Sequence, residues 1–203
     1  MSAPSPTSSF AIDVPDALLA RLRGGDRAAF EQVYRWFERP VFTLALRMCG
    51  DRELAADVLQ DTMLRVVDRV DGFRGERGGE ARPFWGWLRQ IAVNEALMAL
   101  RRARRDEALQ TLDDGLEPAD DLTPPPPVAA DAARLQQALD ALPAATRAVL
   151  WLYHAEGYTH DEIAAAMQRT ASFSKSQLAR GTRRLRALLE PAADMAAREV
   201  AHG

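Results

Sequence analysis

Basic side chains without neighbouring acids gather near the C-terminal end of this 203-residue chain. Arg169–Arg186 holds six basic residues and neither Asp nor Glu. In a helix, the first of these side chains could reach base edges in a DNA groove, and the later arginines could contact phosphates. An isolated basic helix is more often a solvated face, but a short capped helix over Asp161–Met167 and a turn precede this one, as in a helix-turn-helix. The predicted DNA-contacting residues are Lys175, Ser176, Gln177, Arg180, Arg183 and Arg184.

A second cluster interleaves arginines with aromatic residues. Residues 71–82 are rich in Gly, Arg and Glu and lack apolar periodicity, which predicts a loop that becomes ordered on binding. Phe84 is expected in the core, whereas Trp85 and Trp87 are two residues apart and cannot both point inward with Leu88. Aromatic rings among positive charges suit unstacked single-stranded bases, at about 1–3 kcal/mol for each stacking contact. The candidates are Arg74, Arg77, Arg82, Trp85 and Trp87.

A third group is polar. Asp57, Gln60 and Asp61, with Arg65 one turn further on, share one face of a predicted helix. From its spacing alone this face is an ordinary solvated surface.

Catalytic and metal chemistry find little support in the sequence. The single cysteine, Cys49, lies among apolar residues, and its spacing from His154, His160 and His202 matches no metal-ligand pattern. Neither His154 nor His160 has an evident acid partner, so the sequence offers no nucleophile and base for a hydrolase or transferase. We expect no enzyme activity, no cofactor and no metal.

The net charge of −3 conceals a strong zoning of charge. Residues 106–131 contain eight acids, no base and four consecutive prolines, while the segments on either side are mildly basic. This composition predicts a self-repelling, locally stiff linker between two modules. No apolar run approaches the roughly 20 residues that span a bilayer, and no signal sequence is apparent, so we expect no membrane insertion and a cytoplasmic location.

Helical periodicity and capping signals define the modules. In the first, a helix over residues 18–22 precedes one capped by Asp26. Pro40 is predicted to open a third helix that ends at Gly50, a fourth runs from 51 to 70, and a fifth runs from 83 to 105. In the second, helices are predicted at about 131–141, 143–155, 160–167 and 171–189, the third with a capping box.

No strand-like alternation appears, so the predicted fold class is all-α, with two small helical domains joined by an acidic, Pro-rich linker. The predicted divisions are a disordered tail (1–12), a first domain (13–105), the linker (106–131), a helix-turn-helix domain (132–190) and a C-terminal tail (191–203).

Three segments carry a resemblance to a known family. Residues 51–62, residues 157–164 and Phe84–Asn94, which fits the pattern F-x-x-W-L-x-x-I-A-x-N, resemble segments of bacterial sigma factors of the extracytoplasmic-function (ECF) group, in the family's order. The resemblance covers about residues 16–105 and 132–190. It implies a promoter-recognition subunit that binds core RNA polymerase, through the clamp helices of the largest subunit and the flap, and directs initiation at particular promoters.

The resemblance also implies roles for single residues and further partners. The helix after Asp51 would contact the clamp helices, which replaces the interpretation of its polar face as merely solvated. The loop 74–83 would capture a flipped base of the minus-ten element, and the following helix would read that element. The basic helix would read the minus-thirty-five element, and an anti-sigma factor is an expected partner. The implied residues are Asp57, Gln60, Asp61 and Arg65 for the polymerase, Asn94 and Arg101 beside the minus-ten cluster, and the basic-helix residues given above.

The basic helix departs from the family pattern. Gln168 stands where members usually have a turn glycine, Ser174 stands where they have an apolar residue, and Gly181 interrupts the helix at an expected loss of about 1 kcal/mol. These differences predict an unusual docking geometry or an unusual DNA sequence. The alternative function is a helix-turn-helix regulator that acts without polymerase, with the first domain as a helical interaction module.

Overall fold

The computed structural model describes residues 12–77, 80–81, 83–110 and 127–189. The chain forms two compact units, Met1–Asp106 and Glu107–Gly203. The predicted tails, apart from residue 12, and residues 111–126 of the predicted linker lie outside the described residues.

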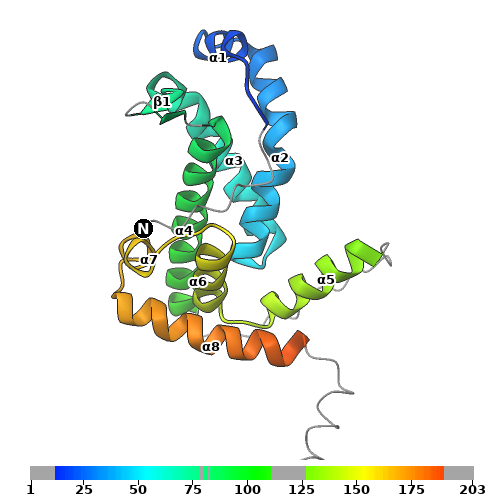
Figure 1. The fold of residues 1–203 in the computed structure, drawn as a ribbon, viewed down its shortest axis with the longest axis vertical. Helices are drawn as coiled ribbons and strands as arrows, with labels where there is room; N and C mark the ends of the chain where they lie inside the picture. Colours follow the sequence, from blue (N-terminus) through cyan, green and yellow to red (C-terminus); the bar gives the residue numbers. More distant parts are fainter. Residues whose placement is uncertain (1–11, 78–79, 82, 111–126, 190–203) are drawn as a thin grey trace, which may run out of the picture. The chain divides into compact units, whose positions relative to one another are not determined.

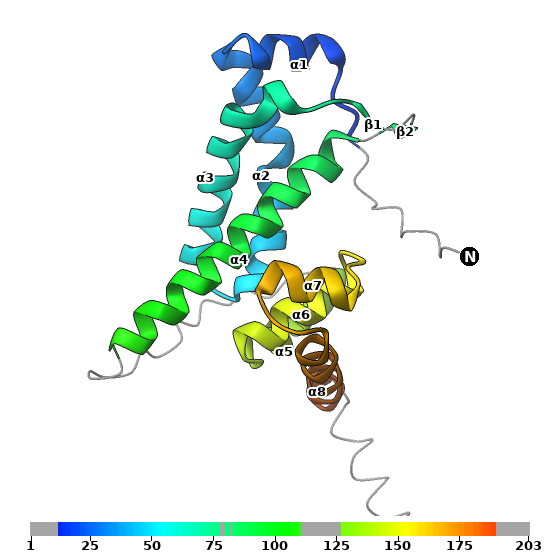
Figure 2. The same cartoon turned by 90° about the vertical axis from the view of Figure 1, so that its left-hand side faces the viewer.

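The N-terminal unit is a helical bundle around an aromatic and aliphatic core. Figures 1 and 2 show α2, α3 and α4 side by side, with α1 across one end. Phe37, Met48, Val66 and Leu88 are among its fully buried side chains. The elements are α1 (Asp16–Arg23), α2 (Arg27–Cys49), α3 (Arg52–Arg69), the 3-10 turn η1 (Val70–Gly72), β1 (Glu76–Arg77), β2 (Glu80–Ala81) and α4 (Phe84–Gln110).

Local capping sets where two of these helices begin. The Asp26 carboxylate accepts hydrogen bonds from the N–H groups of Ala28 (2.8 Å) and Ala29 (3.3 Å), and Asp51 accepts one from Leu54 (2.8 Å). The Arg21 guanidinium, which also bonds Asp26, is the main cause holding the pKa of that carboxyl below its ordinary value, with the Ala29 amide next. Both predicted caps are therefore confirmed.

The prediction that Pro40 begins a separate helix is wrong, because α2 continues through it to Cys49. Proline removes one backbone hydrogen bond and crowds the preceding turn, at about 3 kcal/mol in a helix interior. Phe37 and Val41 lie four residues apart on either side of Pro40, and both are fully buried. The continuous apolar face therefore outweighs the local penalty.

The segment predicted as a loop contains a short strand pair. β1 and β2 are antiparallel, and Phe73 before them is buried. The helix predicted to end at residue 105 extends to Gln110, and the helix predicted from about residue 131 already begins at Pro127.

Over residues 127–189, the C-terminal unit contains four helices, with a core cluster of Leu139, Leu142 and Leu150. The capping box at α7 is confirmed: Thr159 and Glu162 exchange hydrogen bonds at 2.8 and 3.3 Å, and those donated by the N–H and then the hydroxyl of Thr159 lower the pKa of Glu162. The helices are α5 (Pro127–Asp140), α6 (Ala144–His154), α7 (His160–Met167) and α8 (Ala171–Leu189). Each unit is thus helical, and the fold class is all-α.

Candidate functional site

Helices α7 and α8 form the predicted helix-turn-helix. Gln168 ends α7 in the left-handed conformation (φ 54°, ψ 48°). Residues other than Gly adopt this conformation at a penalty of about 1–2 kcal/mol. The Arg169 N–H bonds the Ala164 carbonyl at 2.9 Å, and the Thr170 hydroxyl accepts from the N–H of Phe173 at 3.2 Å. The turn therefore forms without the expected glycine, and Thr170 caps the helix that follows.

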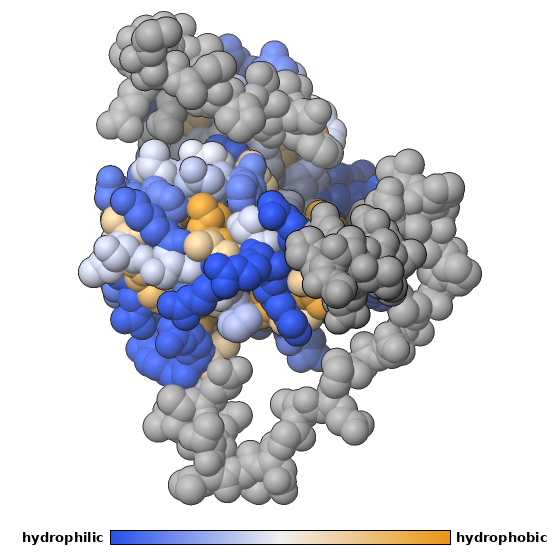
Figure 3. Space-filling model, turned by 60° about the horizontal axis from the view of Figure 1, so that its bottom comes forward, coloured by the Kyte–Doolittle hydropathy of each residue, from blue (hydrophilic) through white to orange (hydrophobic). Residues whose placement is uncertain are grey.

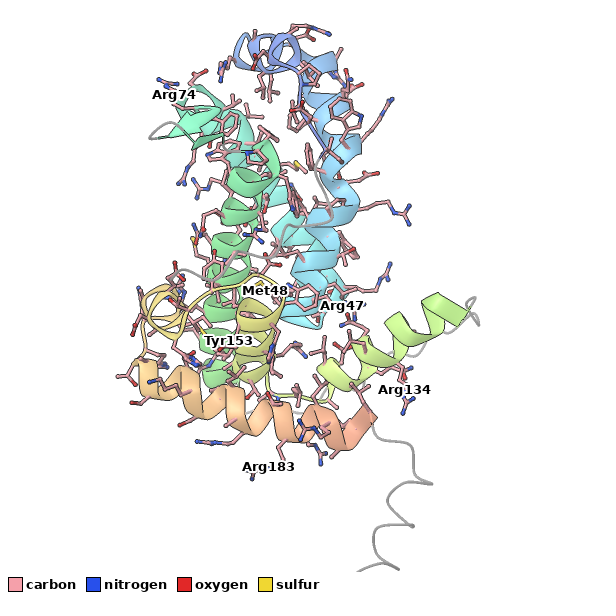
Figure 4. All side chains as sticks on the ribbon, in the orientation of Figure 1. Arg47, Met48, Arg74, Arg134, Tyr153 and Arg183 are labelled. Carbon is pink, nitrogen blue, oxygen red and sulfur yellow. The ribbon has the colours of Figure 1, made fainter. Side chains whose placement is uncertain are left out.

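The outward face of α8 carries the predicted DNA-contacting cations. All of them are exposed, and Figure 4 shows Arg183 pointing away from the helix. In Figure 3, where this end of the molecule comes forward, hydrophilic side chains predominate, with small apolar patches among them. This face can contact phosphates and base edges, since its residues recur at helical spacing. Its members are Lys175, Ser176, Arg180, Arg183 and Arg184.

Gln177 is different, because its amide oxygen accepts a hydrogen bond from the Thr146 hydroxyl at 2.6 Å. Thr146 is buried on α6, so the bond turns Gln177 inward and leaves it half-buried. The bond gives Gln177 a packing role between α6 and α8, and its contact with a base stays a prediction.

Ser174 and Gly181, which differ from the family pattern, both contact neighbouring helices. Ser174 is fully buried, and its hydroxyl lies 3.0 Å from Nδ1 of His160, whose ring stacks on Tyr153 at 4.9 Å. Gly181 lies so close to α6 that a Cβ there would stand 2.6 Å from Cγ2 of Thr146. Where members of the family have an apolar contact, the buried Ser174 therefore has a hydrogen-bond partner.

The polar face of α3 is exposed and lines a groove against α4. Asp57 and Gln60 face solvent, and the half-exposed Asp61 forms an ion pair with Arg102 at 3.1 Å. An exposed pair of this kind contributes little to stability. The groove is lined by Leu54, Asp57, Gln60, Asp61, Ala99, Arg102 and Ala103.

Arg65, one turn further along α3, has a partner within the unit. Its Nε lies 3.3 Å from Oε1 of Glu95, a carboxylate only 6% exposed, and the pair joins α3 to α4. The Arg65 side chain is still 41% exposed, so its contact with polymerase stays a prediction. Leu64 and Val67, which are 56% and 50% exposed, extend the face. Sequence reasoning missed them, although two apolar residues at helical spacing on a polar face were the available signal.

The aromatic cluster at the start of α4 divides into core and surface. Trp85 is 7% exposed and stacks on Phe37 of α2 at 5.9 Å, so its assignment as a base-stacking residue is wrong. Trp87 is half-buried against Phe73 and Phe84, at ring separations of 5.2 and 5.3 Å, and keeps part of its surface free. Residues 85 and 87 both contact the core, because α2 covers one side of the helix and the segment after η1 covers the other.

The remaining minus-ten candidates lie on the same unit. Arg74 is exposed at the base of the β1–β2 pair, where Figure 4 shows it, and donates to the Asp71 carbonyl at 2.7 Å. Asn94 is exposed on α4, while Arg101 is half-buried and donates to the Leu97 carbonyl of its own helix at 3.1 Å. The side chains of Arg77 and Arg82 lie outside the described residues.

Other kinds of site find no support within the described ranges. No group of three or more His, Cys, Asp and Glu residues there could hold a metal ion. Cys49 is buried, as expected. No helix among these residues is both long enough and apolar enough to cross a membrane.

Comparison with known proteins agrees with this division. The family model for Sigma-70 region 2 matches residues 33–106, and that for Sigma-70, region 4 matches residues 132–185, one in each unit. ECF RNA polymerase sigma factor SigM of Mycobacterium tuberculosis is 32% identical over 175 residues, which cover 85% of this chain and 83% of SigM. RNA polymerase sigma factor CarQ of Myxococcus xanthus is 33% identical, with 84% and 95% covered.

Two further similarities differ in what they cover. ECF RNA polymerase sigma factor SigE of Mycolicibacterium smegmatis is 35% identical over 80% of this chain, which spans only 63% of SigE. Among solved structures, the sigma factor RpoE in complex with the anti-sigma factor NepR from Bartonella quintana matches with a TM-score of 0.50 and 24% identity, over 79% of this chain and 96% of that one. At that identity the likeness shows the shared fold.

Together, an all-α fold and a helix-turn-helix with an exposed cationic face are typical of a DNA-binding protein. The chain belongs to the ECF group of the sigma-70 family of RNA polymerase sigma factors. It is an alternative sigma factor, which binds core RNA polymerase and directs promoter-specific initiation of transcription.

Proposed function

We propose that the two units divide the work of a sigma factor. The N-terminal unit docks on polymerase and opens the promoter, and the C-terminal unit recognises the upstream promoter element. The observation that supports this proposal is that each unit presents one exposed face suited to its task. The face on α3 is polar with two apolar residues, and the face on α8 is cationic. Under this proposal the first domain comprises residues 13–105 and the second 132–190, with the linker 106–131 between them.

The face of α3 docks on the clamp helices of the largest polymerase subunit in this proposal. Asp57 and Gln60 offer free polar groups, and Leu64 and Val67 add apolar surface that docking can bury. Asp61 reaches the partner by exchanging its ion pair with Arg102. The mixture suits a specific interface, because apolar contacts supply affinity and charges fix orientation.

Promoter opening is assigned to the loop 74–83 and the first half of α4. Arg74 provides positive charge, the free part of Trp87 offers a ring for an unpaired base, and Asn94 lies further along the helix. Extruding a base from the duplex requires a few kcal/mol, which stacking and hydrogen bonds can return. Arg101 is assigned a phosphate contact through the part of its guanidinium that Leu97 does not occupy.

The face of α8 reads the minus-thirty-five element. Lys175, Ser176 and Arg180 near the N-terminal half are assigned to base edges, and Arg183 and Arg184 to phosphates. The absence of any acidic residue between Arg169 and Arg186 favours this role, since no carboxylate on the helix opposes the DNA backbone.

Regulation and location follow from the same function. Because the related RpoE was solved with an anti-sigma factor, we propose that a protein of that kind covers one or both docking faces of this chain. A polymerase subunit acts in the cytoplasm, and we propose that location. The protein acts by binding and positioning, and we assign no catalytic step to any residue.

The α3 face provides the test. We expect the double variant Asp57→Arg with Gln60→Ala to lose co-purification with core polymerase and promoter-specific run-off transcription. Glu31→Arg makes the same charge change on the exposed surface of α2 and serves as the matched control. If the double variant binds core polymerase and transcribes as the control does, this docking face is refuted. If the wild-type protein itself gives no run-off but binds DNA, the regulator without polymerase becomes the function.

A further inference from the structure

A long-range contact ties α1 to the segment that leads into the β1–β2 pair. Arg23, the last residue of α1, donates from Nη2 to the carbonyl of Phe73 at 3.0 Å and from Nε toward the carbonyl of Val70 at 3.4 Å. The partners are 50 and 47 residues away in the sequence. Figure 2 shows the segment that follows α3 passing close to α1 on its way to β1, and α1 is in contact with η1.

The segment held in this way is itself well anchored. Val70 and Phe73 are buried, and the N–H of Phe73 bonds the Val70 carbonyl at 3.1 Å. The ring of Phe73 meets Phe84 edge-on at 5.3 Å and packs on Trp87, so it rests on the first turn of α4. β1 begins only three residues later, at Glu76. Any rotation of the backbone at residues 70–73 therefore changes the direction in which the hairpin leaves the unit.

Arg23 is suited to prevent such a rotation. A guanidinium is planar, and its N–H groups point in fixed directions, so two bonds to two carbonyls define an orientation and not merely a distance. Lysine keeps the charge but has a single rotatable ammonium and lacks this fork.

We propose that Arg23 is a positioning residue for promoter opening, which holds the backbone at residues 70–73 so that the β1–β2 pair is directed toward the unpaired base. The inference rests on the role proposed above for the loop that contains this pair. Arg23 acts through Phe73 and the loop and does not itself contact the base.

The chain offers a matched control on the same helix. Arg21 is also exposed on α1, but its guanidinium bonds the Asp26 carboxylate and has no contact with residues 70–73. Arg21→Ala therefore removes a guanidinium from α1 while leaving the hairpin anchor intact.

The first experiment separates opening from binding. Holoenzyme is reconstituted with the full chain, and a promoter is selected by run-off with the wild-type protein. We expect Arg23→Ala to slow open-complex formation on duplex DNA about tenfold, equivalent to about 1.4 kcal/mol in the barrier. Transcription from a template already unpaired over the minus-ten element should stay near the wild-type level, because the base is already unstacked. Core-polymerase affinity and the Arg21→Ala control should match the wild type.

Two outcomes would overturn the proposal. Equal losses on the duplex and unpaired templates, or weakened core binding, would show that Arg23 only stabilises the unit. Lysine keeps the charge of Arg23 but cannot form both hydrogen bonds. Full activity of Arg23→Lys would therefore show that only the charge is needed, as for a direct phosphate contact.

A second measurement needs no polymerase or promoter. In the free full-length chain, hydrogen exchange of peptides covering residues 73–77 should be faster in Arg23→Ala than in the wild type, with α2 unchanged. Unchanged exchange at these residues would refute the positioning role even if the chain is a working sigma factor. Conversely, a wild-type holoenzyme without promoter-specific run-off would refute the proposed function and leave the exchange result valid.

Discussion

The close approach of α6 and α8 at Gly181 allows a prediction in which two effects of opposite sign compete. Replacing Gly181 with Ala in an ordinary helix interior would stabilise it by about 1 kcal/mol. Here the new Cβ would lie 2.6 Å from Cγ2 of Thr146 and 2.7 Å from Cδ1 of Leu150, distances at which neighbouring atoms must move. Overpacking of this kind destabilises by about 1–3 kcal/mol.

The simplest relief, rotation of the Thr146 side chain, is itself unfavourable. Its hydroxyl donates to Gln177 at 2.6 Å, and both atoms lie between the helices. Breaking that bond would add about 1 kcal/mol. Summing these effects against the gain in helix propensity, we expect Gly181→Ala to destabilise the C-terminal unit by about 1–3 kcal/mol.

Hydrogen exchange of α6 and α8 peptides in the full chain measures this unit separately from the other. Gly86→Ala is the matched control, because a Cβ on that helical glycine of α4 would have no atom within 4 Å beyond its own helix backbone and chain neighbours. It should stabilise its own unit by up to about 1 kcal/mol. If Gly181→Ala proved as stable as the wild type or more so, the close contact would not control packing, and the reasoning would be refuted.

Three other predictions concern the core, the pH response and DNA binding. Trp85→Ala should destabilise the N-terminal unit by about 3–5 kcal/mol in urea unfolding, because the ring is core; a loss of promoter opening at unchanged stability would contradict this. Because the pKa of Asp26 is lowered on folding, its contribution to stability is complete above the unfolded pKa of about 3.8 and is lost as pH falls through the folded value. Asp26→Asn, which can still cap α2, should flatten that acid-side dependence in thermal melts. Arg183→Ala should weaken DNA binding for all sequences and reduce the salt slope by about 1 in anisotropy titrations, whereas an unchanged slope would remove it from the interface.

Much of the fold was predictable because its determinants are local. Asp26, Asp51 and the Thr159–Glu162 pair mark helix starts through contacts that span two or three residues. Apolar periodicity then identifies the buried faces. The prediction failed at Pro40, where burial of Phe37 and Val41 against the rest of the bundle decides the outcome and the local rule does not.

The candidate sites were predictable only in part, because their details depend on contacts between distant residues. Trp85 is buried against Phe37, and Arg65 is paired with Glu95, 30 residues away. The residues next to Trp85 and Arg65 in the sequence do not indicate these distant partners. Gln177 is likewise paired with Thr146 on another helix. Surface cations on α8 were easier to place, since their exposure follows from helical spacing alone.

The hydrogen bond between His160 and the buried Ser174 helps to fix the register of α8 against its neighbours. A slip of one residue would turn the helix by about 100° and break this bond, and a buried polar group left unpaired carries a penalty of about 1–3 kcal/mol. A purely apolar seam would tolerate such a slip more easily, because one aliphatic contact can replace another. Together with the Thr146–Gln177 bond, this polar pair therefore holds the cations of α8 on its exposed side.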